Sequence, residues 1–337
     1  MNHKQATQLL RYATNVAPEL DGGEVIALSG GISNEIFVVS KAGCDSVLIR
    51  VYGTGEPLCE RTSEEAMVQQ LTASGFGPRV LSTFGHGRVE EFLPNRRALL
   101  PSESLSTGPP DFSAIVAARL AELHELAIVI PGRCAAEEQL TCWLSGCPSS
   151  QFVTRELLAA EIAGVPGLRP AAGSDAEQEI EARLLERRLC HLDLFASNIL
   201  YSESEGGVAF IDYEYAAAAP VGLDIANHFS GCTESIDGAC VSFQTNLYPL
   251  PAAQLHFLAS YFTARRLPPL TDPAAIEFAL RLLIALAAEA ELRWVVWGLV
   301  MWAKPPSAAF DYADYAAQRW RCYCTYKQWS QTGDPRL

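Results

Sequence analysis

The segment 189–215 constrains the fold of this chain most, because two short apolar runs in it alternate with polar and charged residues. The apolar runs are 198–201 and 208–211, and the polar turn Ser-Glu-Ser-Glu-Gly-Gly joins them. Apolar runs of this length around a glycine-containing turn predict a β-hairpin. Such a hairpin brings Asn198 and Asp212 close together at its open end. Alternation along the second strand predicts that Asp212 and Glu214 share one face.

Three polar side chains, His191, Asp193 and Asn198, lead into the hairpin with the spacing H-x-D-x-x-x-x-N. This spacing is similar to the catalytic loop of protein-kinase-like phosphotransferases, and Asp212 falls where their metal-binding aspartate falls. In that chemistry the loop aspartate accepts the proton of the attacking hydroxyl, while the asparagine and the later aspartate hold the metal. The alternative is a loop whose His and Asp only cap a turn. The apolar hairpin and the I-D-x-E run favour the phosphotransferase interpretation.

Composition and charge narrow the class of protein. The 337 residues are 49% hydrophobic and 19% charged, which is typical of a globular chain with two domains or lobes. The net charge of −14 argues against nucleic-acid binding, because recognition of a phosphate backbone needs a basic surface. No signal-peptide pattern opens the sequence, and the apolar stretch 279–302 contains four charged residues. We therefore expect a cytoplasmic protein without a membrane span, whose ten cysteines are free thiols.

The first third of the chain predicts a small antiparallel sheet. A short helix at 5–16 precedes strand patterns at 24–28, 35–40 and 46–52, and a second strand pair at 79–84 and 88–93. Gly30 and Gly31 lie between the first two strands, where their backbone N–H groups can approach an anion closely; on this fragment alone a plain hairpin turn is the favoured interpretation. Pro94 ends the last strand, and we place the boundary between lobes 1–94 and 95–337 there.

Arg50 is a single cation late in an apolar strand, so it needs a partner. The helix predicted at 59–73 offers Glu64, while Glu60 and Glu65 are alternatives that solvent can accommodate. A strand cation followed by a helix glutamate is the layout of the kinase Lys–Glu pair that positions the nucleotide phosphates. Arg50 takes the place of the lysine in this interpretation.

Helical periodicity dominates after residue 95, at 112–126, at 176–188 and from 272 onward. Asp224 stands in a D-x-x-N-H pattern with apolar surroundings, and we expect it to brace the catalytic loop by hydrogen bonds rather than to perform chemistry. The C-terminal helices carry tryptophans and tyrosines at helical spacing. Such a stripe favours a helix core, but rings that face Asp193 would hold an ammonium group by cation–π attraction.

Taken together, these segments make the chain similar to the choline/ethanolamine kinase family from about residue 28 to 328. The resemblance is carried by SGGISN (29–34), VLIRVYG (47–53), GFGP (75–78), GRVEEFLPNRR (87–97), HLDLFASNIL (191–200), FIDYEYA (210–216), GLDIANHF (222–229), WGLV (297–300) and FDYADYAAQRW (310–320). It implies an α+β, two-lobed protein-kinase-like fold, with a small antiparallel-sheet N-lobe and a larger, mainly helical C-lobe. It also implies phosphorylation of a primary alcohol on a small amine by ATP and Mg²⁺.

The resemblance further implies roles for particular residues. Asp193 is the expected base, and Asn198 and Asp212 are the expected Mg²⁺ ligands. The expected amine-binding residues are Asp193, Tyr215, Trp297 and Tyr315. The expected ATP-binding residues are Gly30, Gly31, Ser33, Asn34, Arg50, Glu64, Glu91, Phe92, Leu93, Arg97 and Phe195, with the segment 91–97 as the hinge around adenine.

Three positions depart from the family's pattern. Gly231 stands where the family has an acidic residue, Val300 replaces the second tryptophan of W-G-L-W, and an aromatic residue expected within 234–236 is absent. A quaternary ammonium needs aromatic faces on several sides, whereas a primary ammonium needs hydrogen-bond acceptors as well. The departures therefore favour ethanolamine over choline, with Trp302 or Glu234 as candidates to replace the acid. A kinase of the aminoglycoside phosphotransferase type, a nucleotide-binding protein without turnover, and a homodimer remain open.

Overall fold

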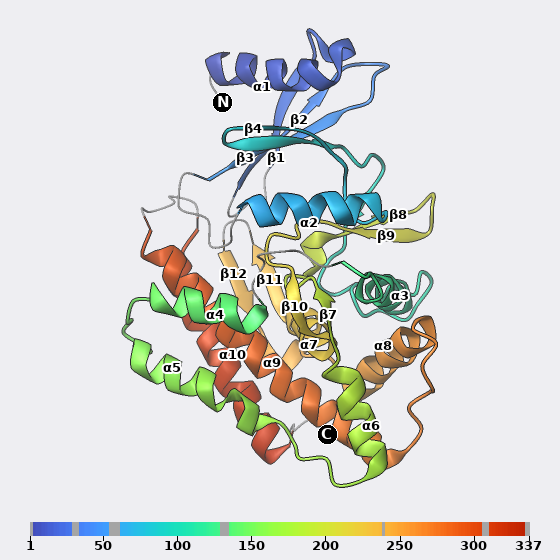
Figure 1. The fold of residues 1–337 in the computed structure, drawn as a ribbon, viewed down its shortest axis with the longest axis vertical. Helices are drawn as coiled ribbons and strands as arrows, with labels where there is room; N and C mark the ends of the chain where they lie inside the picture. The colour runs from blue at the N-terminus through green and yellow to red at the C-terminus, as the bar shows by residue number, and fades with distance from the viewer. Residues whose placement is uncertain are drawn as a thin grey trace.

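Figure 1 shows a computed structural model of the chain, in which a small lobe of strands lies above a larger helical lobe. It describes residues 3–28, 34–53, 61–128, 135–237, 240–304 and 310–333, with the backbone alone at 61–64, 236, 237 and 240. The N-lobe contains α1 (His3–Val16), β1 (Glu24–Leu28), β2 (Asn34–Ser40), β3 (Val47–Tyr52), α2 (Arg61–Ala73), β4 (Val80–Phe84) and β5 (Gly87–Glu91).

The remaining elements belong to the C-lobe. Its helices are α3 (Phe112–His124), α4 (Ala136–Ser145), α5 (Arg155–Gly164), α6 (Asp175–Leu184), α7 (Val221–Gly231), α8 (Pro251–Ala264), α9 (Pro273–Trp302) and α10 (Tyr312–Thr332). Its short strands are β6 (Arg97–Ala98), β7 (Arg187–Cys190), β8 (Ile199–Ser202), β9 (Gly207–Phe210), β10 (Ala217–Pro220), β11 (Glu234–Asp237) and β12 (Cys240–Phe243). The predicted α+β, two-lobed protein-kinase-like fold is confirmed by this arrangement and by the structural comparison given below.

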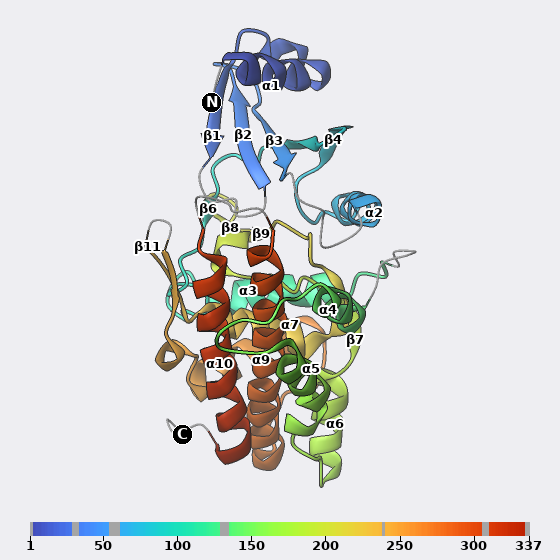
Figure 2. The same ribbon diagram turned by 90° about the vertical axis from the view of Figure 1, so that its left-hand side faces the viewer.

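The N-lobe is a five-stranded antiparallel sheet in the order β1-β2-β3-β5-β4. Strand alternation gives it an apolar face that includes Val39, Ile49 and Val89, which pack with Leu9 and Ala13 of α1. Figures 1 and 2 show α1 across this end of the sheet and α2 on the side nearer the C-lobe. Met67 and Leu71 of α2 belong to the core of the C-lobe, so this helix links the two lobes.

Helix α9 is the centre of the C-lobe, and α10 runs beside it in both views. Charged side chains of α9 find partners within the protein, as in the Arg169–Glu289 ion pair at 2.8 Å and the Arg293–Gln139 hydrogen bond at 2.6 Å. The prediction of a charged core helix at 279–302 is therefore confirmed. Within the described ranges, none of the helices has the length and apolar character needed to cross a membrane.

The predicted hairpin is present, because β8 and β9 pair antiparallel from Ile199↔Phe210 to Ser202↔Gly207. The alternation argument for Asp212 is wrong, however. Strand β9 ends at Phe210, and Asp212 has a positive φ of 66°, so the backbone turns out of the strand before it.

The helix predicted at 176–188 is too long. Helix α6 ends at Leu184, and the following residues form β7, which pairs antiparallel with β10. Strand pairing with a segment thirty residues away outweighs the local helical pattern here. The division of the chain at residue 94 stays a prediction, although β6 already pairs with β8 of the hairpin.

Candidate active site

The predicted catalytic loop runs from the end of β7 to the start of β8, and hydrogen bonds within it fix Asp193 against Asn198. The Asn198 Nδ2 group donates to the backbone oxygen of Asp193 at 2.8 Å and to its Oδ2 at 2.9 Å. Because these two bonds occupy the amide nitrogen, the amide oxygen is the Asn198 atom left to bind a cation. The spacing of four residues between Asp and Asn thus has a structural cause.

His191 ties the catalytic loop to the segment that carries Asp212. The Asp193 backbone N–H donates to His191 Nδ1 at 3.3 Å, so Nε2 carries the ring hydrogen and donates to the Ile211 oxygen at 2.9 Å. Burial lowers the pKa of His191, and nearby Asp224 only partly offsets this. A neutral, doubly bonded ring acts as a clamp rather than as an acid or base.

Asp224 of α7 holds the loop by hydrogen bonds to its backbone. Its Oδ2 accepts the His191 N–H at 2.7 Å, and its Oδ1 accepts the Leu192 N–H at 2.8 Å. Leu192 has a positive φ of 61°, a conformation that needs such support in a branched side chain. His124 completes the brace, with Nε2 3.1 Å from Asp224 Oδ2. The predicted bracing role of Asp224 is confirmed by these bonds.

His124 and Asp224 also lie beside Cys190, and one potential ligand atom from each lies within 4.8 Å of the others. We assign no metal to this group. Burial raises the pKa of Cys190 well above its usual value, and its Sγ donates to the Ala219 oxygen at 3.4 Å. A neutral, hydrogen-bonded thiol is a poor ligand, because metals bind the thiolate.

Arg50 reaches across the lobes to Asp212. Its Nη1 lies 3.3 Å from both Asp212 carboxylate oxygens, and its Nε lies 3.3 Å from Glu90 Oε1. Burial lowers the pKa of Arg50, but the charges of Asp212 and Glu90 raise it well above its ordinary value. The guanidinium is therefore permanently charged at the junction of the lobes.

Glu90 and Arg88 were missed by the sequence reasoning. Both are buried on β5, where Arg88 pairs with Glu90 and lies opposite Arg50 in the register of β3 and β5. Two oppositely charged residues two apart in β5 carry a signal, because alternation puts them on one face, the face of their strand neighbour Arg50. The predicted partner Glu64 lies in α2, and its side chain is outside the described part of the chain.

The electrostatic surroundings of Asp193 suit a proton acceptor. Its side chain is half-buried, and burial is the main reason that its pKa is raised well above the ordinary value. The nearby charges of Asp212, Glu214 and Glu234 raise it further. A carboxyl that resists ionisation holds an accepted proton more strongly, which favours general-base chemistry.

The predicted amine-binding rings come together around Trp297 of α9. Its indole Nε1 donates to the Tyr215 hydroxyl at 2.7 Å, and its ring centroid lies 5.5 Å from that of Tyr315 and 5.6 Å from that of Tyr312. Trp294 adds a further ring, 5.4 Å from Tyr215. These residues come from α9, α10 and the segment after β9, so an aromatic cluster lies beside the catalytic segment.

The departure at Gly231 has a steric explanation. A Cβ atom there would lie 2.5 Å from Cδ1 of Phe195, so no side chain fits unless that ring moves. Phe195 is buried, 5.5 Å from the Trp294 ring. Its contacts lie on the aromatic side of the loop, and its expected role in nucleotide binding stays a prediction.

The other residues expected to bind ATP are only partly described. Gly30, Gly31 and Ser33 lie outside the described residues, and Asn34 begins β2 opposite Tyr52. At the expected hinge, Glu91 pairs with Arg79 at 3.1 Å, and Phe92 and Leu93 are half-buried. None of these positions carries a described contact that decides its role.

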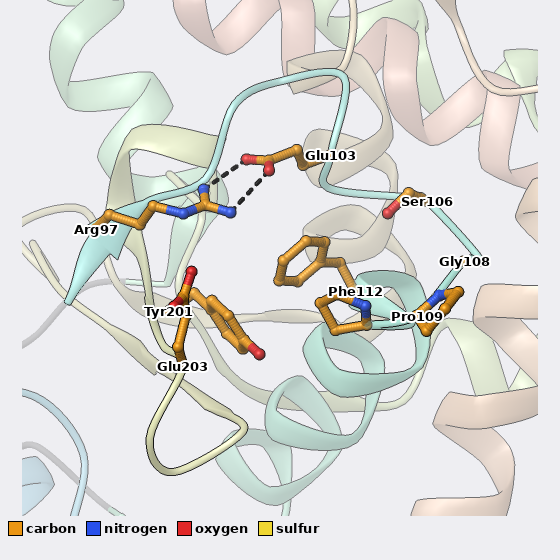
Figure 3. Close-up of a pocket in the computed structure, with 9 residues that line it drawn as sticks. Arg97, Glu103, Ser106, Gly108, Pro109, Phe112, Tyr201 and Glu203 are labelled. Carbon is orange, nitrogen blue, oxygen red and sulfur yellow. Dashed lines mark hydrogen bonds and ion pairs between the residues drawn. The ribbon is translucent and has the colours of Figure 1, made fainter. Parts of the chain in front are cut away.

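Arg97 lines a surface pocket of about 420 Å³ beside β6 and β8 (Figure 3). Its guanidinium forms a bidentate ion pair with Glu103 at 2.7 and 2.8 Å and lies 5.8 Å from the rings of Phe112 and Tyr201. The residues that line this pocket include none of those predicted to act on the phosphoryl group or the amine. The expected role of Arg97 at the adenine also stays a prediction.

Comparisons with known proteins agree with this geometry. A family model described as choline/ethanolamine kinase matches residues 25–324. "Probable choline kinase 2" of Arabidopsis thaliana is 29% identical over 318 residues, which span 89% of this chain and 84% of that protein. Human "Ethanolamine kinase 1" is 27% identical over 353 aligned positions, spanning 96% of this chain and 72% of that protein. The crystal structure of a choline kinase from Cryptosporidium parvum superposes with a TM-score of 0.78 at 19% identity, over 97% of each chain.

Proposed function

The chain belongs to the choline/ethanolamine kinase family, and on this premise we propose that it phosphorylates ethanolamine in preference to choline. The protein is an ATP-dependent kinase that acts on the alcohol group of a small amino alcohol. The observation that carries the proposal is the convergence of Asp193, Asn198, Asp212 and Arg50 beside an aromatic cluster. The same convergence argues against a nucleotide-binding protein without turnover, because each reactive group is present and held in place.

We assign Asp193 to the substrate hydroxyl. Its carboxylate orients the alcohol and accepts the proton as the oxygen attacks the γ-phosphorus of ATP, and the bond from that phosphorus to the β,γ-bridging oxygen breaks. The bond from Asn198 Nδ2 fixes one carboxylate oxygen, which leaves the other for the alcohol. The raised pKa of Asp193 supports this role, because burial is its main cause and a partly desolvated carboxylate holds an accepted proton more strongly.

We assign the Asn198 amide oxygen and the Asp212 carboxylate to Mg²⁺. Both are oxygen ligands of the kind that Mg²⁺ prefers. The two bonds donated by Asn198 Nδ2 leave its amide oxygen as the atom available to a cation. A bound Mg²⁺ would neutralise charge on the phosphates. Asp212 would then exchange its contact with Arg50 for the metal.

Arg50 supplies the permanent cation for the phosphates. Glu90 anchors its Nε, so the Nη groups stay directed at the lobe junction when Asp212 turns to a metal. The guanidinium presents several N–H donors in a fixed plane, which suits phosphate oxygens. Its position on β3 also supports the comparison with the kinase strand lysine.

The preference for ethanolamine rests on what the amine pocket lacks. Val300 contributes an aliphatic side chain one helical turn after Trp297, and Gly231 has no room for an acidic side chain. Trp302, one of the two candidates for compensation, is 48% exposed, whereas Glu234 is half-buried. Removing rings from the pocket lowers its affinity for a quaternary ammonium more than for a primary ammonium, because a primary ammonium can also form hydrogen bonds.

The test is ATP turnover by the whole protein with ethanolamine, choline and an aminoglycoside, measured side by side. We expect kcat/KM to be highest on ethanolamine, and Asp193→Ala to lose about 10²–10⁴-fold on every amine it accepts. The exposed Asp45→Ala is the matched control. Turnover of the aminoglycoside alone, or of no amine, contradicts the proposal, and a higher kcat/KM on choline reverses the proposed preference.

We also propose a cytoplasmic location. The cysteines in the described part of the chain are free thiols, which fits a reducing compartment. A homodimer is compatible with a site whose described residues lie in one chain. Light scattering on the purified protein and localisation of a tagged copy test these two points.

A further inference from the structure

The aromatic cluster next to the catalytic loop already contains a cation of the protein. Arg319 of α10 is fully buried, and its guanidinium carbon lies 3.8 Å from the ring centroid of Phe243, 5.1 Å from those of Phe195 and Tyr315, and 5.8 Å from that of Trp294. These distances are those of cation–π contacts. Part of the aromatic surface that could enclose a substrate ammonium is therefore occupied by Arg319.

Glu291 of α9 neutralises this arginine. Its two carboxylate oxygens lie 3.2 and 3.3 Å from Arg319 Nη1, and both side chains are inaccessible to solvent. Burial raises the pKa of Glu291, and the charge of Arg319 opposes that shift. A buried carboxylate committed to a buried guanidinium cannot also serve a substrate without leaving that guanidinium unpaired, which is costly.

Glu234 is a second acidic side chain near the cluster, and it forms no such ion pair with a described residue, although the charge of Arg319 also acts on it and opposes the rise that burial gives to its pKa. In the ranges that the structure describes, its carboxylate has no hydrogen bond and no ion pair, and it is half-buried. Strand pairing sets it opposite Phe243, whose ring packs 5.6 Å from Tyr315. Its charge contributes to the raised pKa values of both Asp193 and Tyr315, after burial. The pairing of Glu234 with Phe243 therefore places it beside a predicted amine-binding ring.

We propose that Glu234 binds the ammonium group of the substrate, while the buried Arg319–Glu291 pair keeps the neighbouring rings from enclosing a quaternary ammonium. This inference rests on the proposed function and adds the residue that selects the amine. Each N–H of a primary ammonium can donate to the Glu234 carboxylate, whereas a quaternary ammonium has no N–H to donate. Selectivity at this site should therefore follow the number of N–H groups on the substrate.

The experiment uses the full chain and four amines that differ in N-methylation: ethanolamine, its N-methyl and N,N-dimethyl derivatives, and choline. For the wild type we expect kcat/KM to fall with each added methyl group. For Glu234→Gln we expect KM for ethanolamine to rise about 10- to 100-fold, the effect of losing a hydrogen bond to a charged group. The KM for choline and for ATP should change by less than about threefold, because neither depends on that bond.

Two further variants separate binding from folding. Glu234→Asp keeps the charge and should restore part of the preference for ethanolamine, and Glu156→Gln removes an exposed carboxylate on α5 and should match the wild type. Equal melting temperatures of wild type and Glu234→Gln show that the fold is intact. An unstable Glu234→Gln leaves the Glu234→Asp variant to decide by the same amine series.

The possible failures are distinct. A wild type that phosphorylates ethanolamine, with an unchanged KM and an unchanged methylation series in Glu234→Gln, overturns the inference and leaves the proposed function standing. A wild type that phosphorylates no amine overturns the proposed function. In that case calorimetric titration with ethanolamine, compared between wild type and Glu234→Gln, still decides whether Glu234 holds the ammonium group.

Discussion

Asp193, Asn198 and Asp212 come from one continuous segment, whereas the rings of the amine pocket come from two consecutive helices, α9 and α10, and from Tyr215 after β9, which is 82 residues from Trp297. The first group is fixed by short bonds to the backbone, such as Asn198 Nδ2 to the Asp193 oxygen at 2.8 Å. The second group is fixed by the packing of large side chains in the C-lobe core.

This difference explains which half of the site can vary, the hairpin segment with its reactive groups or the ring cluster around the amine. A change in the hairpin segment breaks hydrogen bonds that hold several reactive groups at once, so few residues are tolerated there. A change in the ring cluster alters the volume and the number of faces around the amine while the reactive groups stay in place. We therefore expect mutations in the hairpin to lower activity on every amine equally, and mutations in the cluster to change the ratio between amines.

Among the variants that test this comparison, the largest effect is expected for Asp212→Asn. The variant removes a predicted metal ligand charge and a partner of Arg50, and it keeps the size of the side chain. We expect kcat/KM to fall by about 10²–10³-fold, as for the loss of one electrostatic contact to a transition state, and more Mg²⁺ to be needed for half-maximal rate. Steady-state kinetics with ethanolamine and choline over a Mg²⁺ titration measures both effects.

The ratio of kcat/KM between the two amines tests the comparison itself. It should be the same in Asp212→Asn as in the wild type, because Asp212 acts on the phosphates alone. The exposed Asp45→Asn is the control for loss of an aspartate charge. A ratio that changes severalfold in Asp212→Asn would show that the two halves are not independent.

A smaller effect is expected for Asp224→Asn, which disturbs the loop without touching a substrate. Asp224 accepts hydrogen bonds from two backbone N–H groups. In the variant one of these would face the amide NH₂ group, and a buried donor without an acceptor costs about 1–3 kcal/mol of stability. The resulting shift of the loop should lower kcat by up to about 10²-fold on both amines. Urea unfolding monitored by circular dichroism measures the stability, and kcat is measured in parallel.

The dependence on pH has a definite sign. Burial alone would raise the pKa of Asp224, but the hydrogen bond from His124 and the electrostatic attraction of the His124 and His191 rings hold it below its usual value. A carboxylate with a lowered pKa stabilises the folded state above the unfolded pKa of about 3.9, and this contribution is lost as pH falls through the folded value. The stability difference between wild type and Asp224→Asn should therefore be full at pH 7 and shrink in acid. A difference that grows toward low pH would contradict this account.

The sequence predicted the local parts of the structure well, because their signals are local. The five N-lobe strands and the hairpin have alternating or apolar runs between turn residues, and they fold as expected. The end of α6 was mispredicted because β7 is fixed by pairing with β10, a contact that the run 176–188 does not contain. Asp212 was wrongly predicted to lie on a strand face, because the backbone turns at its positive φ without a glycine there to indicate the turn in the sequence.

The same limit applies to the site. Asp193, Asn198 and Asp212 could be identified because their spacing along the chain is the signal. Glu90 was missed as the partner of Arg50, because the contact joins residues forty apart and a helix glutamate offered an equally good charge. The Arg319–Glu291 pair joins α10 to α9, and nothing in either helix alone distinguishes a buried pair from two solvated charges.

Arg50→Lys should have an intermediate effect, and it should change the KM for ATP alone. A lysine ammonium keeps the charge but lacks the planar group that contacts Glu90 and Asp212 together, so its direction is less well fixed. We expect KM for ATP to rise about tenfold, the loss of one charge-assisted hydrogen bond, with the KM values for both amines unchanged. Initial-rate kinetics with each substrate varied in turn separates the two. An increase confined to an amine KM would contradict the role given to Arg50.

The smallest effect is expected for Val300→Trp, which adds a ring to the amine pocket. Position 300 lies one turn after Trp297 on α9, so the new indole would be directed to the same side of the helix. One further cation–π contact is worth about 1 kcal/mol, and kcat/KM for choline should rise about fivefold while that for ethanolamine changes less. Competition between the two amines in one assay measures the ratio directly.

Val300 is only 9% exposed, so the larger ring must displace neighbouring side chains, and overpacking of this kind costs about 1–3 kcal/mol of stability. Val300→Phe adds a ring at lower volume and separates the gain in cation–π contact from the strain. If choline turnover improves in neither variant while Glu234→Gln still loses ethanolamine, the amine is chosen by the carboxylate rather than by the number of rings. The ring cluster would then only pack around the amine without selecting it. Of the residues on the amine side of the site, Glu234 alone would change the ratio between amines.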